Sequence, residues 1–209
     1  MGAWNRAILN PDWLAVNIFD IPKGQEYTFT LSIDNTGTRT KTTINDINFI
    51  PSSERLVISV AKDDPELFKV VAEKSVKLCD KLPHTPITGI GHNFSYQLDE
   101  NENFVLDIDF RASKFIDVYK EINASPNLLA NKISILQHSL SLEQDKNVIL
   151  NLSFHLENGK KMLRFNYHHG INDIDSAKYS LKRYYDNYLH SQLTTSKLII
   201  KGDNKNESF

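Results

Sequence analysis

The chain is poor in the residues that mark several specialised classes of protein. Its 209 residues include a single cysteine, Cys79, so no internal disulfide can form and nothing indicates an oxidising compartment. No apolar run approaches the roughly 20 residues that a membrane-spanning helix needs, and residues 1–6 lack the long apolar core of a signal peptide. These features predict a cytoplasmic protein with no membrane segment.

Neither sign of charge dominates the chain. It has 24 Lys and Arg residues against 26 Asp and Glu residues, for a net charge of −2 at pH 7. Proteins that bind nucleic acid need clustered Lys and Arg to neutralise phosphates, so we expect no nucleic-acid partner. The fractions of hydrophobic residues (40%) and charged residues (24%) are ordinary for a globular protein. The length fits one large domain or two small halves packed together.

Alternating residues predict strands in the first third of the chain. Residues 27–34 alternate between apolar and polar side chains, a turn follows at 35–37, and the Thr-rich stretch 38–43 returns as a second strand. Residues 54–62 form a third strand with one apolar face, and a weaker pattern favours a strand near 13–19.

Two longer segments have apolar residues at helical spacing. Asp64 is a suitable N-cap and Pro65 a suitable first residue for a helix that ends before Pro83. A second helix is predicted from about Asp173 to Leu193, capped by Asn172 or Asp173.

Residues 87–98 and 104–112 read as the two strands of a long hairpin. A register with Leu98 opposite Phe104 puts apolar residues on one face. The other face then pairs polar residues: Ser95 with Asp107, Asn93 with Asp109 and Gly91 with Arg111. Residues 113–122 are consistent with a short helix.

A three-stranded meander is predicted around two turns. Asn158-Gly159 is a strong two-residue hairpin signal and pairs Phe154 with Leu163, Leu152 with Phe165 and Leu150 with Tyr167. The loop at 145–147 pairs the following residues: Leu142 with Leu150, Leu140 with Leu152 and His138 with Phe154.

Runs of strands separated by single helices predict an α+β fold. We expect a large, mainly antiparallel sheet of meanders and hairpins with two main helices packed on one face. We expect a single domain over 1–200, with a flexible tail over 201–209. The strands-then-helix plan also suggests a duplication, with halves at 13–83 and 87–193.

Polar residues on the strands supply the candidates for ligand binding: His92, Asn93, Asp107, Asp109, Arg111 and His138. Asp107 and Asp109 share one strand face and could hold Mg²⁺, but a solvated polar face explains them better. His92 and His138 fall on apolar faces, where they read as core residues or as the lining of a pocket or interface. We expect no metal and no cofactor.

The last helix is rich in aromatic residues. Tyr184, Tyr185, Tyr188 and Leu189 are candidates for an interface, because they widen the apolar stripe beyond what one sheet needs. The alternative is a broad stripe that faces the core of its own chain.

None of the common catalytic motifs occurs in the sequence, including the Gly-x-Ser-x-Gly elbow, the His-Glu-x-x-His helix and the Walker loop. The pattern favours a non-enzymatic protein-binding or interaction module of a type found in bacteria or mobile elements. We expect its partner to be a second copy of the chain, in a homodimer, or another protein. Two alternatives stay open. One is an enzyme on the face of Asn93, Asp107, Asp109 and Arg111. The other is a small-ligand pocket around His92, His138 and Tyr96.

Overall fold

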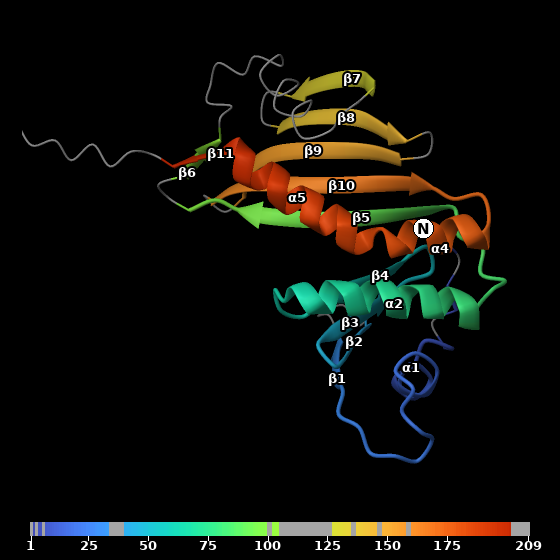
Figure 1. Cartoon of the computed structure of the whole chain (residues 1–209). Coiled ribbons are helices and arrows are strands. Elements are labelled where there is room, and N and C mark those ends of the chain that lie inside the picture. The colour runs from blue at the N-terminus through green and yellow to red at the C-terminus, as the bar shows by residue number, and fades with distance from the viewer. Residues whose placement is uncertain are drawn as a thin grey trace, which may run out of the picture. The chain divides into compact units, whose positions relative to one another are not determined.

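The computed structural model describes the chain except residues 1, 3, 6, 34–39, 100–101, 105–126, 135–136, 146–147, 158–159 and 202–209. It describes the backbone alone at 103–104, 127–134, 137–145, 154–157 and 200–201. The chain forms two compact units: unit 1 comprises Met1–Ile90 and His169–Asp186, and unit 2 comprises Gly91–His168 and Asn187–Phe209. Helices and antiparallel sheets confirm the predicted α+β class (Figure 1).

Unit 1 contains a four-stranded antiparallel sheet in the order β1-β2-β3-β4. The strands are β1 (Thr30–Ile33), β2 (Thr40–Ile44), β3 (Ile47–Pro51) and β4 (Leu56–Val60). β1, β2 and β4 confirm three predicted strands, whereas β3 is missing from the prediction. The signal for β3 is Asn45-Asp46: both residues adopt positive φ, 48° and 61°, in a two-residue turn between the paired Ile44 and Ile47.

The first element is a helix, α1 (Pro11–Asn17), so the strand predicted near 13–19 is wrong. The Asn10 side chain accepts a hydrogen bond from the Trp13 backbone N–H at 2.9 Å, and Pro11 occupies the first turn. Such a cap satisfies a backbone donor that the helix leaves unpaired, and the fixed φ of proline suits that turn. These two local signals outweigh the weak alternation that favoured a strand.

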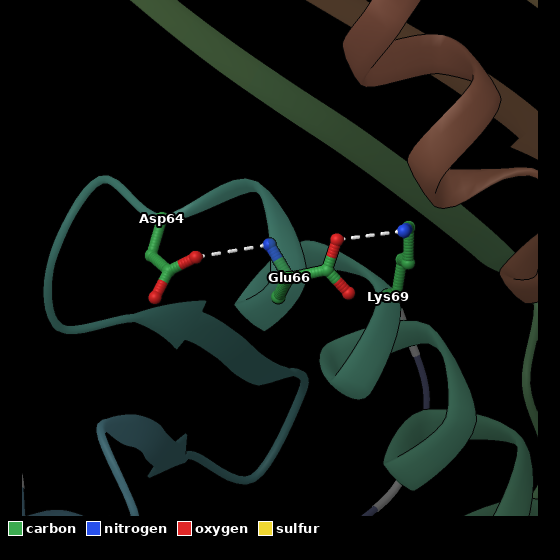
Figure 2. A network of polar contacts seen from close by, with 3 residues as sticks. All are labelled: Asp64, Glu66 and Lys69. Atoms are coloured by element: carbon green, nitrogen blue, oxygen red, sulfur yellow. Dashed lines mark hydrogen bonds and ion pairs between the residues drawn. The ribbon is translucent and has the colours of Figure 1, made fainter.

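α2 (Pro65–Lys81) confirms the predicted helix and its cap. An Asp64 carboxylate oxygen accepts from the Glu66 N–H at 3.0 Å, and Glu66 pairs with Lys69 at 2.7 Å one turn later (Figure 2). The cap places a negative charge at the positive end of the helix dipole, which stabilises the first turn.

The core of unit 1 lies between its sheet and its helices. Ile44, Ile47 and Phe49 are fully buried on one face of the sheet. Side chains of α1 and α2 complete this cluster: Leu14, Ala15, Ile18, Val71 and Leu78. Burial of each large apolar side chain contributes about 1.5–3 kcal/mol, so this cluster holds the helices to the sheet.

The predicted helix from 173 to 193 is interrupted. α4 (Ile174–Lys182) ends at Arg183, and α5 (Tyr184–Leu198) follows directly. Asp173, one of the two predicted caps, caps α4 in a reciprocal pair of hydrogen bonds with Ser176. No glycine or proline marks the break, so the apolar spacing alone could not reveal it.

Unit 2 contains a five-stranded sheet in the order β5-β10-β9-β8-β7. The strands are β5 (Gly89–Gln97), β7 (Asn127–Ser134), β8 (Gln137–Asp145), β9 (Val148–Glu157) and β10 (Lys160–Gly170). The register of β8 with β9 confirms every predicted pair between them: His138 with Phe154, Leu140 with Leu152 and Leu142 with Leu150. β9 and β10 are neighbours, as the turn signal at 158–159 predicts.

β5 pairs with β10, a partner that local sequence patterns did not indicate. The Leu98 N–H donates to the Lys161 carbonyl at 3.0 Å. Two further short strands pair with each other, β6 (Glu102–Phe104) and β11 (Ile199–Lys201), and Phe104 lies opposite Ile199. The predicted pairing of Leu98 with Phe104 is therefore not found. The rest of that predicted strand, and the helix predicted at 113–122, lie outside the described residues.

The duplicated plan is not confirmed. The sheet of unit 1 uses its strands in chain order, whereas the sheet of unit 2 inserts β10 between β5 and β9. Of the predicted tail, Lys201 belongs to β11, and 202–209 lie outside the described residues. Within the described part of the chain, no helix is both long and apolar enough to cross a membrane.

Candidate functional site

The structure does not bring the predicted ligand-binding residues together in one place. Asp107, Asp109 and Arg111 lie outside the described residues. His92 and Asn93 are neighbours on β5, so their side chains point to opposite faces of the sheet in unit 2. His92 is buried and Asn93 is exposed. The two faces are therefore separate candidate sites.

His92 is buried on β5, and α5 lies across the sheet that contains β5 (Figure 1). The Nδ1 atom of His92 is 2.9 Å from Nδ2 of the buried Asn187 on α5. Because an amide nitrogen only donates, Nδ1 is the acceptor, and the ring proton is on Nε2. This pair fixes the histidine tautomer and ties the helix to the strand.

α5 contacts the sheet of unit 2 through several hydrogen-bonded polar side chains. Tyr96 Oη lies 2.6 Å from Ser191 Oγ, and Tyr167 Oη lies 2.6 Å from His190 Nδ1. Burial lowers the pKa of His190 below its ordinary value, which keeps the ring neutral. The buried polar residues on this side of the helix are Asn187, Ser191, Thr194 and Thr195. Hydrogen bonds therefore set the position of α5, because an apolar stripe alone would allow it to slide.

The structure does not bring His92 and His138 together. His138 is on β8, and β10 and β9 separate that strand from β5. Three steps of about 4.8 Å put the two backbones about 14 Å apart. The two histidines therefore do not form one compact pocket.

Asn93 belongs to a chain of amides on the opposite face of the sheet. Asn151 Nδ2 donates to Asn166 Oδ1 at 3.3 Å, and Asn166 Nδ2 donates to Asn93 Oδ1 at 2.6 Å. Asn93 Nδ2 then donates to the Gly91 carbonyl at 3.3 Å. The three amides point the same way across β9, β10 and β5, so each bond polarises the next.

A shallow pocket of about 280 Å³ opens over this chain of amides. We call its polar side chains the asparagine face: Asn93, Ser95, Asn151, Ser153, Arg164 and Asn166. Amide and hydroxyl groups both donate and accept, whereas the guanidinium only donates. The described lining is therefore rich in donors and carries one positive charge.

No group of three or more His, Cys, Asp or Glu side chains that could hold a metal ion occurs among the described residues. Cys79 is buried on α2, and burial raises the pKa of its thiol to about 11. A thiol that stays protonated is a poor nucleophile, so the buried Cys79 is a core residue rather than a candidate catalytic group.

The interface candidates on the last helix have different surroundings. Tyr184 packs against the Phe68 ring with centroids 5.9 Å apart, and Lys69 lies over the Tyr185 ring at 4.9 Å. Tyr188 is buried against Phe94. Leu189 is 45% exposed. The tyrosines therefore have contacts within their own chain, and Leu189 is the outward-facing member of the set.

A more continuous apolar surface lies on β1 and just before it. Phe29, Leu31 and Ile33 are 42%, 49% and 60% exposed. Alternate residues of a strand share a face, so the three form one row, the β1 row. Leu31 is opposite Thr42, which is opposite Phe49 in the core. The row therefore extends the core-facing side of the sheet beyond the buried cluster.

The beginning of the β1 row is held by α1. Tyr27 Oη donates to Asp12 at 2.7 Å, and the Tyr27 ring lies 5.7 Å from the Phe29 ring. Partial burial, together with this carboxylate, raises the pKa of Tyr27 to about 12. The hydroxyl therefore keeps its proton, and the hydrogen bond persists over the whole physiological pH range. The period-two pattern at 27–34 predicts this strand but cannot show that its apolar side is uncovered.

No protein-family model, no curated protein and no solved structure shows a significant match to this chain. Its function must therefore be inferred from its own residues.

Proposed function

We propose that the protein is a non-enzymatic interaction module that forms a homodimer through its β1 rows. The observation that carries the proposal is the exposure of three large apolar side chains: Leu31 and Ile33 on the terminal strand of a sheet, and Phe29 directly before it. Exposed apolar rows of this kind mark interaction sites in soluble proteins.

The edge strand lacks the features that normally prevent association. Residues 27–33 contain no Lys, Asp, Glu, Arg or Pro. β1 is hydrogen-bonded to β2 on one side and is the last strand in the order of its sheet, taken over the described residues. Edges that must stay unpaired usually carry a charge, a proline or a bulge, so this edge is suited to pairing.

The partner that best fits β1 is a second copy of it. In an antiparallel pair centred on Leu31, Phe29 lies opposite Ile33 of the other copy, and Thr30 lies opposite Ser32. The apolar residues then share one face and the hydroxyl residues the other. Two four-stranded sheets would join into one of eight strands, and both β1 rows would gain apolar neighbours.

Sedimentation velocity of the full chain and two variants tests the proposal. Leu31→Lys places two ammonium groups opposite each other at the centre of the pair, where like charges repel. Leu193→Lys is the matched control, because Leu193 on α5 is 51% exposed against 49% for Leu31. We expect Leu31→Lys to raise the dimer dissociation constant at least about tenfold, and Leu193→Lys to leave it unchanged.

Other outcomes would overturn the proposal. A wild-type chain that stays monomeric at micromolar concentrations excludes the homodimer. A dimer that survives Leu31→Lys but is weakened by Leu189→Lys or Leu193→Lys would assign the interface to α5.

A further inference from the structure

We propose that a pocket in unit 1 binds a small organic cation, an amine with an apolar body. The pocket has a volume of about 660 Å³ and lies between α1 and the loop at 18–27, in the segment that connects α1 to β1 (Figure 1). Sites for small molecules typically have volumes in this range. The proposal does not rest on the homodimer, because no residue of the β1 row lines the pocket.

Hydrogen bonds hold both ends of this loop against α1. Near its start, the Ile21 N–H donates to the Ala15 carbonyl at 3.0 Å, and at its end the Tyr27 hydroxyl donates to Asp12 at 2.7 Å. Between these points the chain turns at Gly24, whose φ of 86° suits glycine. A pocket that is formed before its ligand arrives loses less entropy on binding, so a small ligand gains affinity from it.

The charge of the lining favours a cation. Its charged side chains are Asp12, Glu26 and Lys23, two negative charges against one positive charge. Over the part of the chain that the structure describes, Lys23 and Glu26 make no side-chain hydrogen bond or ion pair, and Asp12 accepts one bond, from Tyr27 through Oδ1. Asp12 Oδ2 and the Glu26 carboxylate can therefore accept charge-assisted hydrogen bonds from a ligand ammonium group.

The apolar part of the lining suits the body of such a ligand. Trp13, Ile21 and Tyr27 line the pocket, and each is partly buried. The faces of indole and phenol rings attract cations, and their area also contacts alkyl or aryl groups. An amine with an apolar body can use both the rings and the carboxylates, whereas an anion would be repelled by the net negative charge of the lining.

NMR titration of the isotopically labelled full chain tests the site with three probes of similar shape. These are benzylammonium chloride, benzyl alcohol and sodium benzoate, which carry a positive, a zero and a negative charge at pH 7. Sodium chloride keeps the ionic strength equal. The reporter is the indole N–H signal of Trp13, and that of Trp4, which does not line the pocket, is the internal reference.

We expect benzylammonium to shift the Trp13 signal to saturation with a dissociation constant on the order of 1 mM. Benzyl alcohol should bind at least about fivefold more weakly, because it lacks the charge that the carboxylates and rings attract. Benzoate should give no saturating shift.

Four variants make the test specific. Glu26→Gln and Asp12→Asn each remove one carboxylate and keep its shape, and asparagine can still accept from Tyr27. Each should weaken binding of benzylammonium about threefold. Lys23→Gln removes the positive charge of the lining and should instead tighten binding about twofold. Asp63→Asn is the matched control, because it removes an exposed carboxylate of unit 1 that does not line the pocket, and its effect should stay below about 1.5-fold.

Several results would overturn the proposal. It is wrong if benzylammonium gives no saturating shift of the Trp13 signal, or if benzyl alcohol or benzoate binds as tightly as benzylammonium. It is also wrong if neither Glu26→Gln nor Asp12→Asn weakens binding more than Asp63→Asn does. Failure here leaves the homodimer untouched, because none of these variants changes the β1 row.

Discussion

Cys79 illustrates how burial controls the chemistry of one side chain. Burial raises the pKa of its thiol to about 11. At pH 8 we therefore expect the folded chain to react with a thiol reagent at least on the order of tenfold more slowly than the chain unfolded in urea. A colorimetric thiol assay with and without urea measures both rates. Equal rates would show that Cys79 is accessible in the folded chain.

His190 should make stability depend on pH. Burial lowers its pKa in the folded chain, whereas an unfolded histidine has a pKa of about 6.5. Below that pH the unfolded chain takes up a proton that the folded chain resists, so the free energy of unfolding falls as the pH drops from about 7. Above about pH 7 this contribution is complete and constant.

The variant His190→Gln isolates this contribution, because glutamine can still bond to the Tyr167 hydroxyl but does not titrate. Urea unfolding at pH 7.5 and pH 5.5 measures the difference. We expect a smaller loss of stability in the variant than in the wild type. Identical pH dependence in the two proteins would mean that His190 does not resist protonation.

Single residues could be assigned to faces from the sequence, but not to partners. Alternation along 87–98 correctly puts His92 on the buried side and Asn93 on the exposed side of one strand. The partner of His92, Asn187, is 95 residues away, and that of Asn93, Asn166, is 73 residues away. No local pattern encodes contacts of that range.

At the scale of elements, Asp64 should stabilise α2 measurably. Replacing Asp64 by Ala removes the hydrogen bond to the Glu66 N–H and should lower the free energy of unfolding by about 1 kcal/mol. Asp63→Ala is the control, because Asp63 is an exposed neighbour that precedes the cap; its effect should stay within about 0.5 kcal/mol. Urea unfolding followed by circular dichroism compares the two variants. Equal losses would show that the effect is one of charge rather than capping.

The register of the proposed β1 pair can be tested by cross-linking. In a pair centred on Leu31, the two copies of Leu31→Cys lie opposite each other with Cα atoms about 4.5–5.5 Å apart, within the range for a disulfide. Ser32→Cys is one residue away and meets Thr30 instead, so it should cross-link poorly. Non-reducing gel electrophoresis after mild oxidation reads the result. Efficient cross-linking of Ser32→Cys but not of Leu31→Cys would rule out this register.

Most elements with strong local signals were predicted, and α1 is the exception. Asp64-Pro65 and Asp173 mark the starts of α2 and α4 correctly. α1 was missed although Asn10 and Pro11 supply the same kind of signal. The break at Arg183 could not be anticipated, because no glycine or proline marks it and most of the buried residues of α5 are polar.

At the scale of the whole molecule, the fold class followed from the order of strands and helices, but the topology did not. The β8–β9 registers were predictable because a short loop connects those strands and fixes their alignment. The β5–β10 pair joins strands separated by many residues, and any strand with a similar alternation could have taken that position. The exposure of the β1 row is a property of this topology, since it depends on which strand ends the sheet.

Native mass spectrometry of the unmodified full chain at micromolar concentration is the measurement to make first. The homodimer predicts a species at twice the chain mass of 24.0 kDa, in a proportion that grows with concentration. A single species at the monomer mass over the whole concentration range would contradict the assignment of the β1 row as a self-association surface.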